Sequence, residues 1–172
     1  MQKPIINIKD VKLHPRPASF KAPDKSRVQY DAHMGPIGAI IGAQKLGYNL
    51  TKVPKGQCAF PFHNHRVNEE MFLILEGCGE LRYGDTTYPV SKMDIIACPS
   101  GGKKTAHQLI NTGSENLLYL AISTMSSPEI AEYPDSNKFG LLAGFSPDCE
   151  GKSKNYQFIS REEDSLDYWD GE

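Results

Sequence analysis

Apolar and polar residues follow a different pattern in the middle of this 172-residue chain than at its two ends. From Ile37 to about Ser123 the chain reads as short strands separated by turns at close spacing. Tyr83–Thr86, with Gly84 and Asp85 at its centre, predicts a tight hairpin, because both central residues tolerate the backbone angles of such turns. No helix of ten or more residues is expected here, so the pattern predicts an all-β sandwich, jelly roll or barrel. The expected strands span residues 37–41, 46–53, 59–65, 70–75, 79–83, 86–90, 94–97, 107–111 and 117–123.

The segments on either side of this region lack strand periodicity. The N-terminal segment carries five prolines and predicts an extended arm on the surface. Because such an arm needs something to pack against, it favours a homodimer. After Met125, Ser160–Glu163 fits a capping box and predicts one short helical turn. The aromatic tail Leu166–Trp169 is expected to dock on the barrel wall. The predicted organisation is an N-terminal arm (1–36), a barrel (37–125) and a C-terminal extension packed on the barrel (126–172).

Composition narrows the class of protein. The length suits one well-buried core and is too short for two ordinary domains. A net charge of −2 offers no basic field for nucleic acid, and no stretch approaches the roughly 20 apolar residues of a membrane span. The N-terminus lacks the apolar run and cleavage site of a signal peptide, so a cytoplasmic protein is expected. The four cysteines form no CxxC pair and are interpreted as reduced, mostly small core residues: Cys58, Cys78, Cys98 and Cys149.

The segment His63–Glu70 carries the candidate chemistry. Residues two apart on a strand point to the same face, so His63 and His65 are expected to project together and converge on one ion. Glu70, on the next strand and on the same face as Phe72, adds a carboxylate oxygen. Imidazole and carboxylate together suit Mn, Fe, Ni, Co or Zn rather than Ca or Mg.

A fourth ligand has to come from another part of the chain. His107 is the best remaining histidine, because it starts a short expected strand after a Gly-rich turn, whereas His14 and His33 lie in the irregular arm. Glu69 competes with Glu70 for the carboxylate position.

These residues resemble the two motifs of the cupin superfamily. The first reads Gly56, six residues, His63 and His65, four residues, Glu70, six residues and Gly77. The second reads Met93, five residues, Pro99–Gly101, then His107 and Asn111. The resemblance covers residues 46–123 and implies the cupin double-stranded β-helix, a jelly-roll barrel. It assigns the metal-ligand roles to His63, His65, Glu70 and His107, and the spacing to Gly77 favours Glu70 over Glu69.

Three features depart from the motifs. The spacer after Gly56 is one residue longer than usual, and Met93 stands where a glycine is expected. Five residues instead of two separate Gly101 from His107. The chain also resembles a group of uncharacterised bacterial cupins that are labelled by analogy as sugar-phosphate isomerases.

The expected cofactor is one divalent metal ion, Zn, Mn, Fe or Ni, with positions left open for a small-molecule ligand. Phe72 is expected to line an apolar pocket. Lys103 and Lys104, in the lengthened turn, would hold a carboxylate or phosphate if one points inward, or are otherwise two solvated lysines. Three functions fit: a metal-dependent enzyme acting on a sugar, sugar phosphate or related oxygenated acid in an isomerase-like reaction, an Fe(II)-dependent dioxygenase, or a non-catalytic binding protein. No general base can be named from the sequence.

Overall fold

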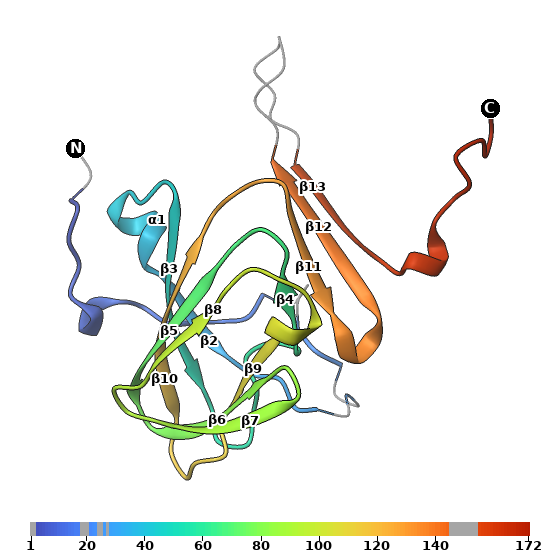
Figure 1. Ribbon diagram of the computed structural model, residues 1–172. Coiled ribbons are helices and arrows are strands. Elements are labelled where there is room, and N and C mark those ends of the chain that lie inside the picture. The colour runs from blue at the N-terminus through green and yellow to red at the C-terminus, as the bar shows by residue number, and fades with distance from the viewer. Residues whose placement is uncertain (1–2, 18–20, 24–25, 27, 145–154) are drawn as a thin grey trace.

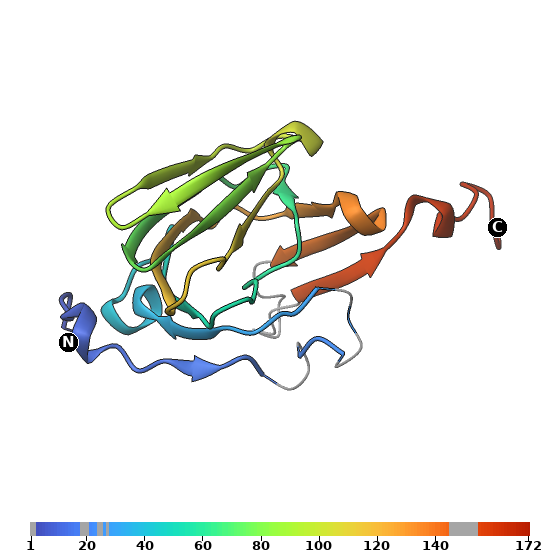
Figure 2. The same ribbon diagram turned by 90° about the horizontal axis from the view of Figure 1, so that it is seen from below.

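A computed structural model describes residues 3–17, 21–23, 26, 28–144 and 155–172. Its strands pair antiparallel into three sheets, and two of these form a barrel (Figures 1 and 2). The six-stranded barrel sheet contains, in order, β1 (His14–Pro15), β2 (His33–Pro36), β3 (Leu46–Val53), β10 (Leu117–Thr124), β5 (Glu70–Glu76) and β8 (Ile95–Cys98). The three-stranded barrel sheet contains β7 (Thr86–Ser91), β6 (Cys78–Tyr83) and β9 (His107–Ile110). The third sheet contains β13 (Asn155–Ser160), β12 (Lys138–Gly144), β11 (Glu129–Tyr133) and β4 (Asn64–His65).

Apolar side chains fill the space between the two barrel sheets. Phe72 and Ile74 lie on the inward face of β5 and are buried, as the two-residue period of a strand predicts. Tyr119 on β10 packs edge-on against Phe72, with ring centroids 5.4 Å apart. The expected hairpin also forms, because β6 and β7 pair up to Tyr83 and Thr86. The predicted all-β barrel is therefore confirmed.

Two of the expected strands are wrong. Residues 37–41 form a short helix, α1 (Ile37–Ile41), which ends at Gly42 in the left-handed conformation. A five-residue apolar run fits either structure, and here Ile37 and Ile41 pack on one side in a small second core. Residues 59–62 form no strand, His63 forms an isolated bridge to His107, and only the two residues Asn64 and His65 make a strand, which pairs with β11.

The expectation that strand structure ends after Met125 is also wrong. Strands β11, β12 and β13 form a sheet beside the barrel (Figure 1). Their sequence hides this, because the buried positions of β11 hold Glu129 and Ala131 rather than large apolar residues. In contrast, Phe158 and Ile159 on β13 are exposed. The usual alternation between an apolar inner face and a polar outer face is therefore absent.

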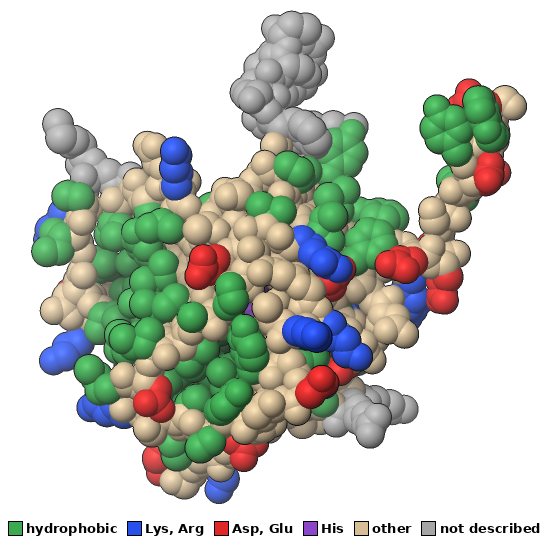
Figure 3. All heavy atoms as spheres, in the orientation of Figure 1, with side chains coloured by type: hydrophobic (Ala, Val, Ile, Leu, Met, Phe, Trp, Pro, Cys, Tyr) green, Lys and Arg blue, Asp and Glu red, His purple; other side chains and the backbone are tan. Residues whose placement is uncertain are grey.

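The N-terminal arm packs on the barrel of its own chain (Figure 2). It contains a 3-10 turn, η1 (Ile8–Asp10), and its strands β1 and β2 extend the six-stranded sheet beyond β3. Figure 3 shows apolar side chains gathered on the face of the molecule over β3, β5 and β10. Exposed apolar faces are typical of protein contacts, and the homodimer stays a prediction.

The C-terminal tail does not dock on the barrel. The predicted helical turn forms as η5 (Glu162–Asp164), where the Asp164 carboxylate accepts a hydrogen bond from the Arg161 N–H at 3.0 Å. Beyond η5 the chain extends away from the barrel (Figure 1), and Tyr168 and Trp169 are 85% and 71% exposed. The two rings contact each other instead, with centroids 4.8 Å apart. The expectation of a docked aromatic tail is therefore wrong for this chain.

Two further findings concern the earlier expectations on membranes and cysteines. No helix among the described residues is long and apolar enough to cross a bilayer. Cys58 and Cys98 are free and buried, as expected, whereas Cys78 is free and exposed. Cys149 lies outside the described residues.

The turn between β7 and β8 keeps the backbone conformation of a glycine although Met93 occupies it. Met93 has φ 77° and its side chain is 68% exposed, while the Asp94 carboxylate accepts a hydrogen bond from the Ser91 N–H at 2.6 Å. A side chain in the left-handed region costs about 1–2 kcal/mol.

We therefore expect Met93→Gly to raise the free energy of unfolding by about 1 kcal/mol, after the extra flexibility of glycine in the unfolded chain is subtracted. Urea denaturation measures this change. Met93→Ala is the control, because it keeps the Cβ atom and should give no gain. An equal gain from both variants would show that the Met93 side chain, and not its backbone conformation, is unfavourable.

Candidate metal centre

Backbone hydrogen bonds join the two segments that carry the three histidines, residues 63–65 and 101–107. The His107 N–H donates to the carbonyl of His63 at 2.8 Å, and the His63 N–H donates back to that of His107 at 3.2 Å. The Gly101 N–H donates to the carbonyl of His65 at 2.7 Å. His63 thus reaches the site through an isolated bridge to His107, and not as part of a continuous strand with His65.

One carboxylate oxygen lies at the centre of the cluster. Glu70 Oε2 is 3.0 Å from His107 Nε2, 3.5 Å from His65 Nε2 and 3.8 Å from His63 Nε2. Glu70 begins β5, where it precedes the inward-facing Phe72 by two residues. Glu69 is exposed, and its backbone N–H donates to the Thr124 hydroxyl at 3.0 Å. The structure therefore brings together all four predicted ligands and leaves Glu69 outside.

The other ring nitrogen of each histidine faces an acceptor. His63 Nδ1 is 2.8 Å from the carbonyl oxygen of Pro61, and His107 Nδ1 is 3.2 Å from that of Thr105. His65 Nδ1 lies 3.8 Å from Glu129 Oε2. An acceptor beside Nδ1 holds the proton there and leaves the lone pair on Nε2. The Nε2 lone pair of His63 is therefore free on the side of Glu70. His107 Nε2 lies within hydrogen-bond distance of Glu70 and binds a metal ion once its proton there is displaced, and the 3.8 Å gap between His65 Nδ1 and Glu129 is too long for a hydrogen bond.

Burial and mutual charge shift the pKa values of the cluster. Burial would raise the pKa of Glu70, but hydrogen bonding from His107 and the proximity of His65 and His63 outweigh it and hold that pKa well below its usual range. Burial, helped by His107, lowers the pKa of His63 to about 4. Burial also acts to lower the pKa of His65, but the carboxylates of Glu70 and Glu129 outweigh burial and raise it. At neutral pH, Glu70 is therefore ionised and His63 is neutral, the forms in which both bind metals.

The cluster fits a divalent metal ion. The donor atoms of His63, Glu70 and His107 lie within 4.8 Å of one another. Ligands on a shared ion at bond lengths of about 2.0–2.2 Å are up to roughly 4.4 Å apart, so small side-chain movements suffice. His65 is looser, because its ring centroid is 6.3 Å from that of His107, yet both of its ring nitrogens are buried without a hydrogen-bond partner. Buried polar atoms are rarely left unpaired, and a metal ion would satisfy Nε2.

The lengthened turn before His107 does not displace the histidine. Its extra residues form a 3-10 turn, η3 (Lys103–Thr105), in which the Thr105 hydroxyl donates to the Gly102 carbonyl at 2.9 Å. This turn points outward, so both Lys103 and Lys104 are exposed and neither lines the cavity that the described residues form around the cluster. Of the two alternatives, the structure shows two solvated lysines, and the assignment of Lys103 and Lys104 to the substrate site at the cluster is corrected.

The cluster opens onto a cavity of about 470 Å³. His63, His65 and Glu70 line it together with Phe72, as predicted for that side chain, while His107 lies behind them, almost fully buried. Strands β12 and β13 contribute apolar residues to the opposite wall. The sequence did not predict these two strands, and so it did not predict their part in the cavity. Further lining residues missed from the sequence are Arg16, Tyr133 and Lys138.

Part of this wall had a detectable signal in the sequence. Tyr133 and Lys138 flank a turn that contains η4 (Pro134–Ser136) and Asn137, and such residues between two short runs are typical of a hairpin. No comparable signal marks Arg16 in the irregular arm.

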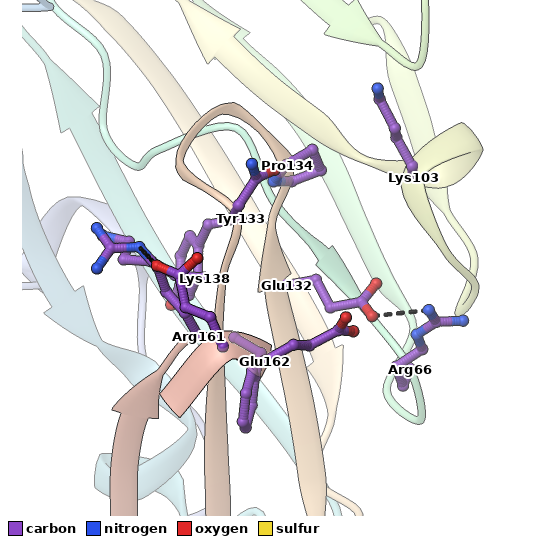
Figure 4. A pocket seen from close by; sticks show the side chains of 11 residues that line it. Arg66, Lys103, Glu132, Tyr133, Pro134, Lys138, Arg161 and Glu162 are labelled. Carbon is purple, nitrogen blue, oxygen red and sulfur yellow. Dashed lines mark hydrogen bonds and ion pairs between the residues drawn. The ribbon is translucent and has the colours of Figure 1, made fainter. Parts of the chain in front are cut away.

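A second pocket (Figure 4) shares Tyr133 and Lys138 with the cavity at the cluster but contains none of the four proposed ligands. It has a volume of about 560 Å³, and Lys103, Glu132 and Arg161 are among its lining residues. Its charges partly neutralise each other, since Arg66 and Glu132 form an ion pair of 2.7 Å. We therefore place the functional site at the histidine cavity.

Comparisons with known proteins give one family and several similar structures. Residues 49–123 match the family described as Cupin domain. No curated protein matches the chain in a comparison of sequences.

Three solved structures illustrate the likeness in fold. A sugar phosphate isomerase of the cupin superfamily from Silicibacter pomeroyi has a TM-score of 0.71 at 18% identity, covering 97% of this chain and 98% of that one. A protein from Acidithiobacillus ferrooxidans, also named as a sugar phosphate isomerase, has a TM-score of 0.61 at 23% identity over 73% and 76% of the two chains. A predicted oxalate decarboxylase from Thermotoga maritima has a TM-score of 0.56 at 18% identity over 71% and 99%. At these identities the likeness concerns the fold alone.

Proposed function

The chain has the cupin fold, with a cupin domain over residues 49–123, and from this premise we propose that it is a metal-dependent enzyme acting on a small oxygenated molecule. The proposed substrate is a sugar, a sugar phosphate or a related acid, and the proposed reaction is isomerase-like. Two structurally similar proteins are named as sugar phosphate isomerases, which supports this substrate class.

The observation that carries the proposal is the position of the cluster in the cavity wall. Three of the four proposed ligands line the cavity, so a bound substrate would lie directly beside them. A divalent ion held there would supply Lewis-acid polarisation of a substrate carbonyl. The protein contributes a largely apolar wall, formed by Phe72 and by residues of β12 and β13.

Tyr133 is the proton donor in this proposal. Its ring stacks on that of His63, with centroids 6.3 Å apart and planes at 24°. Burial raises the pKa of Tyr133, so its phenol stays protonated at neutral pH. The amino group of Lys138 lies 5.3 Å from the centroid of the Tyr133 ring and places a positive charge beside it.

Metal analysis combined with a substrate panel tests the proposed function. Protein purified without a metal-binding tag is expected to carry about one divalent ion per chain, from Zn, Mn, Fe or Ni. With that ion it should interconvert aldose and ketose phosphates, lose the activity on chelation, and regain it on adding the metal back. Metal-loaded protein that binds sugars without converting them would overturn the enzyme proposal in favour of a binding protein. Fe(II) with substrate-dependent oxygen uptake would overturn it in favour of a dioxygenase.

A further inference from the structure

The N-terminal arm brings a cationic side chain to the cavity of the metal cluster. Arg16 follows β1 and lines the same cavity as His63 and Glu70. Its guanidinium donates to the carbonyl of Ala59, and its Cζ atom lies 5.0 Å from the centroid of the Phe60 ring. The Phe60 ring is in turn 6.2 Å from the ring of His63. The arm therefore holds Arg16 near the cluster, with the Phe60 ring between its guanidinium and His63.

The charge of Arg16 is not neutralised by a direct partner. No carboxylate of the described residues forms an ion pair with it, although the charge of the exposed Asp31 acts on it through space. Its Nε atom is buried and has no hydrogen-bond partner. An unpaired buried donor is unfavourable, so a ligand that satisfies it gains affinity.

The cavity as a whole favours an anion. Its one acidic lining residue, among those described, is Glu70, whose charge is engaged by the three histidines. Its cationic lining residues are Arg16 and Lys138. Most of the remaining surface is apolar, and low polarity strengthens the attraction between an enclosed guanidinium and an oxyanion.

We propose that Arg16 binds a carboxylate or phosphate group of the substrate, so that the ligand is an oxyanion extending from the metal cluster to the arm. This inference rests on the proposed function, and it gives Arg16 the anion-binding role that the sequence suggested for Lys103 or Lys104. The planar fork of a guanidinium matches the oxygens of both anions, and Arg stays charged in a partly buried position. The arm thereby becomes part of the substrate site.

Isothermal titration of the metal-loaded protein tests this inference with two pairs of probes. D-Ribose 5-phosphate is compared with D-ribose, and D-glucuronate with D-glucose, so the two arms distinguish phosphate from carboxylate. We expect at least one anion to bind about tenfold or more tightly than its neutral partner. Arg16→Gln should remove that preference, whereas Lys103→Gln, in the outward turn, should keep it.

A purely structural role of Arg16 gives a different result. If Arg16 only clamps the arm, Arg16→Gln should lower the melting temperature and weaken the neutral and anionic sugars equally, which would overturn the inference. Arg16→Lys keeps the charge and should restore part of the anion preference. An unchanged preference in Arg16→Gln would also overturn it.

The titration also separates this inference from the proposed function. Anion preference that depends on Arg16 in a protein without turnover supports the anion site and contradicts the enzyme proposal. Turnover that Arg16→Gln leaves unchanged, together with an unchanged anion preference, contradicts the anion site alone.

Discussion

Replacing Glu70 by alanine is expected to weaken binding of the divalent metal ion at least about 100-fold. This loss exceeds the loss of metal affinity that follows when a residue that only orients a ligand is removed. The three histidine Nε2 atoms all face Glu70 Oε2, at 3.0–3.8 Å. Without this carboxylate the site keeps three imidazole donors and loses the one carboxylate among its proposed ligands. Because the lowered pKa keeps Glu70 ionised, that charge is present throughout the neutral range of pH.

Glu69→Ala is the matched control for this prediction. It removes the same side chain one residue earlier, from an exposed position on the other face, and should leave metal affinity unchanged. Competition for Zn²⁺ with a chromogenic chelator measures both variants, and melting curves of the metal-free proteins establish that each is folded. Wild-type affinity in Glu70→Ala, or an equal loss in Glu69→Ala, would contradict the ligand assignment.

The sequence predicted the barrel well because its strands obey simple periodicity. In strand β5 the buried Phe72 and Ile74 alternate with half-buried positions, so the shared facing of Glu70 and Phe72 follows from residue parity alone. The pairing of His63 with His65 was expected on one strand, yet His63 reaches the site through its bridge to His107. Residue parity thus correctly predicted that His63 and His65 lie side by side, although the backbone that carries them is not the continuous strand that was expected.

The cavity wall opposite the cluster could not be predicted in the same way. On β11 the buried positions are occupied by Glu129 and Ala131, whose burial depends on partners distant in sequence. Arg16 lies in an arm without periodicity, and its place in the cavity depends on its contact with Ala59, 43 residues away. Long-range contacts of this kind leave no local pattern, so the metal ligands were predictable and the surroundings of the substrate were not.

Replacing Glu129 by alanine is expected to lower the free energy of unfolding by about 3 kcal/mol, because several charge-assisted hydrogen bonds are lost together. The buried Glu129 carboxylate accepts hydrogen bonds from the backbone N–H groups of Arg66 (3.1 Å), Val67 (3.3 Å) and Asn68 (2.7 Å). These residues form the loop that joins His65 to Glu70, so the same carboxylate fixes the spacing of two proposed metal ligands.

Metal affinity should fall in the same variant, by about tenfold, since Glu129 also lies 3.8 Å from Nδ1 of His65 and helps to orient that ring. Glu129→Gln is the graded control, because its amide oxygen still accepts a hydrogen bond from the loop while its charge is lost, and it should lie between the wild type and Glu129→Ala in both measurements. Urea denaturation and the Zn²⁺ competition assay report the two effects separately.

If stability falls while metal affinity stays at the wild-type value, Glu129 supports the loop without orienting His65. Because the looser position of His65 within the cluster makes its orientation the variable part of the site, the affinity measurement is the one that decides whether β11 belongs to the metal centre.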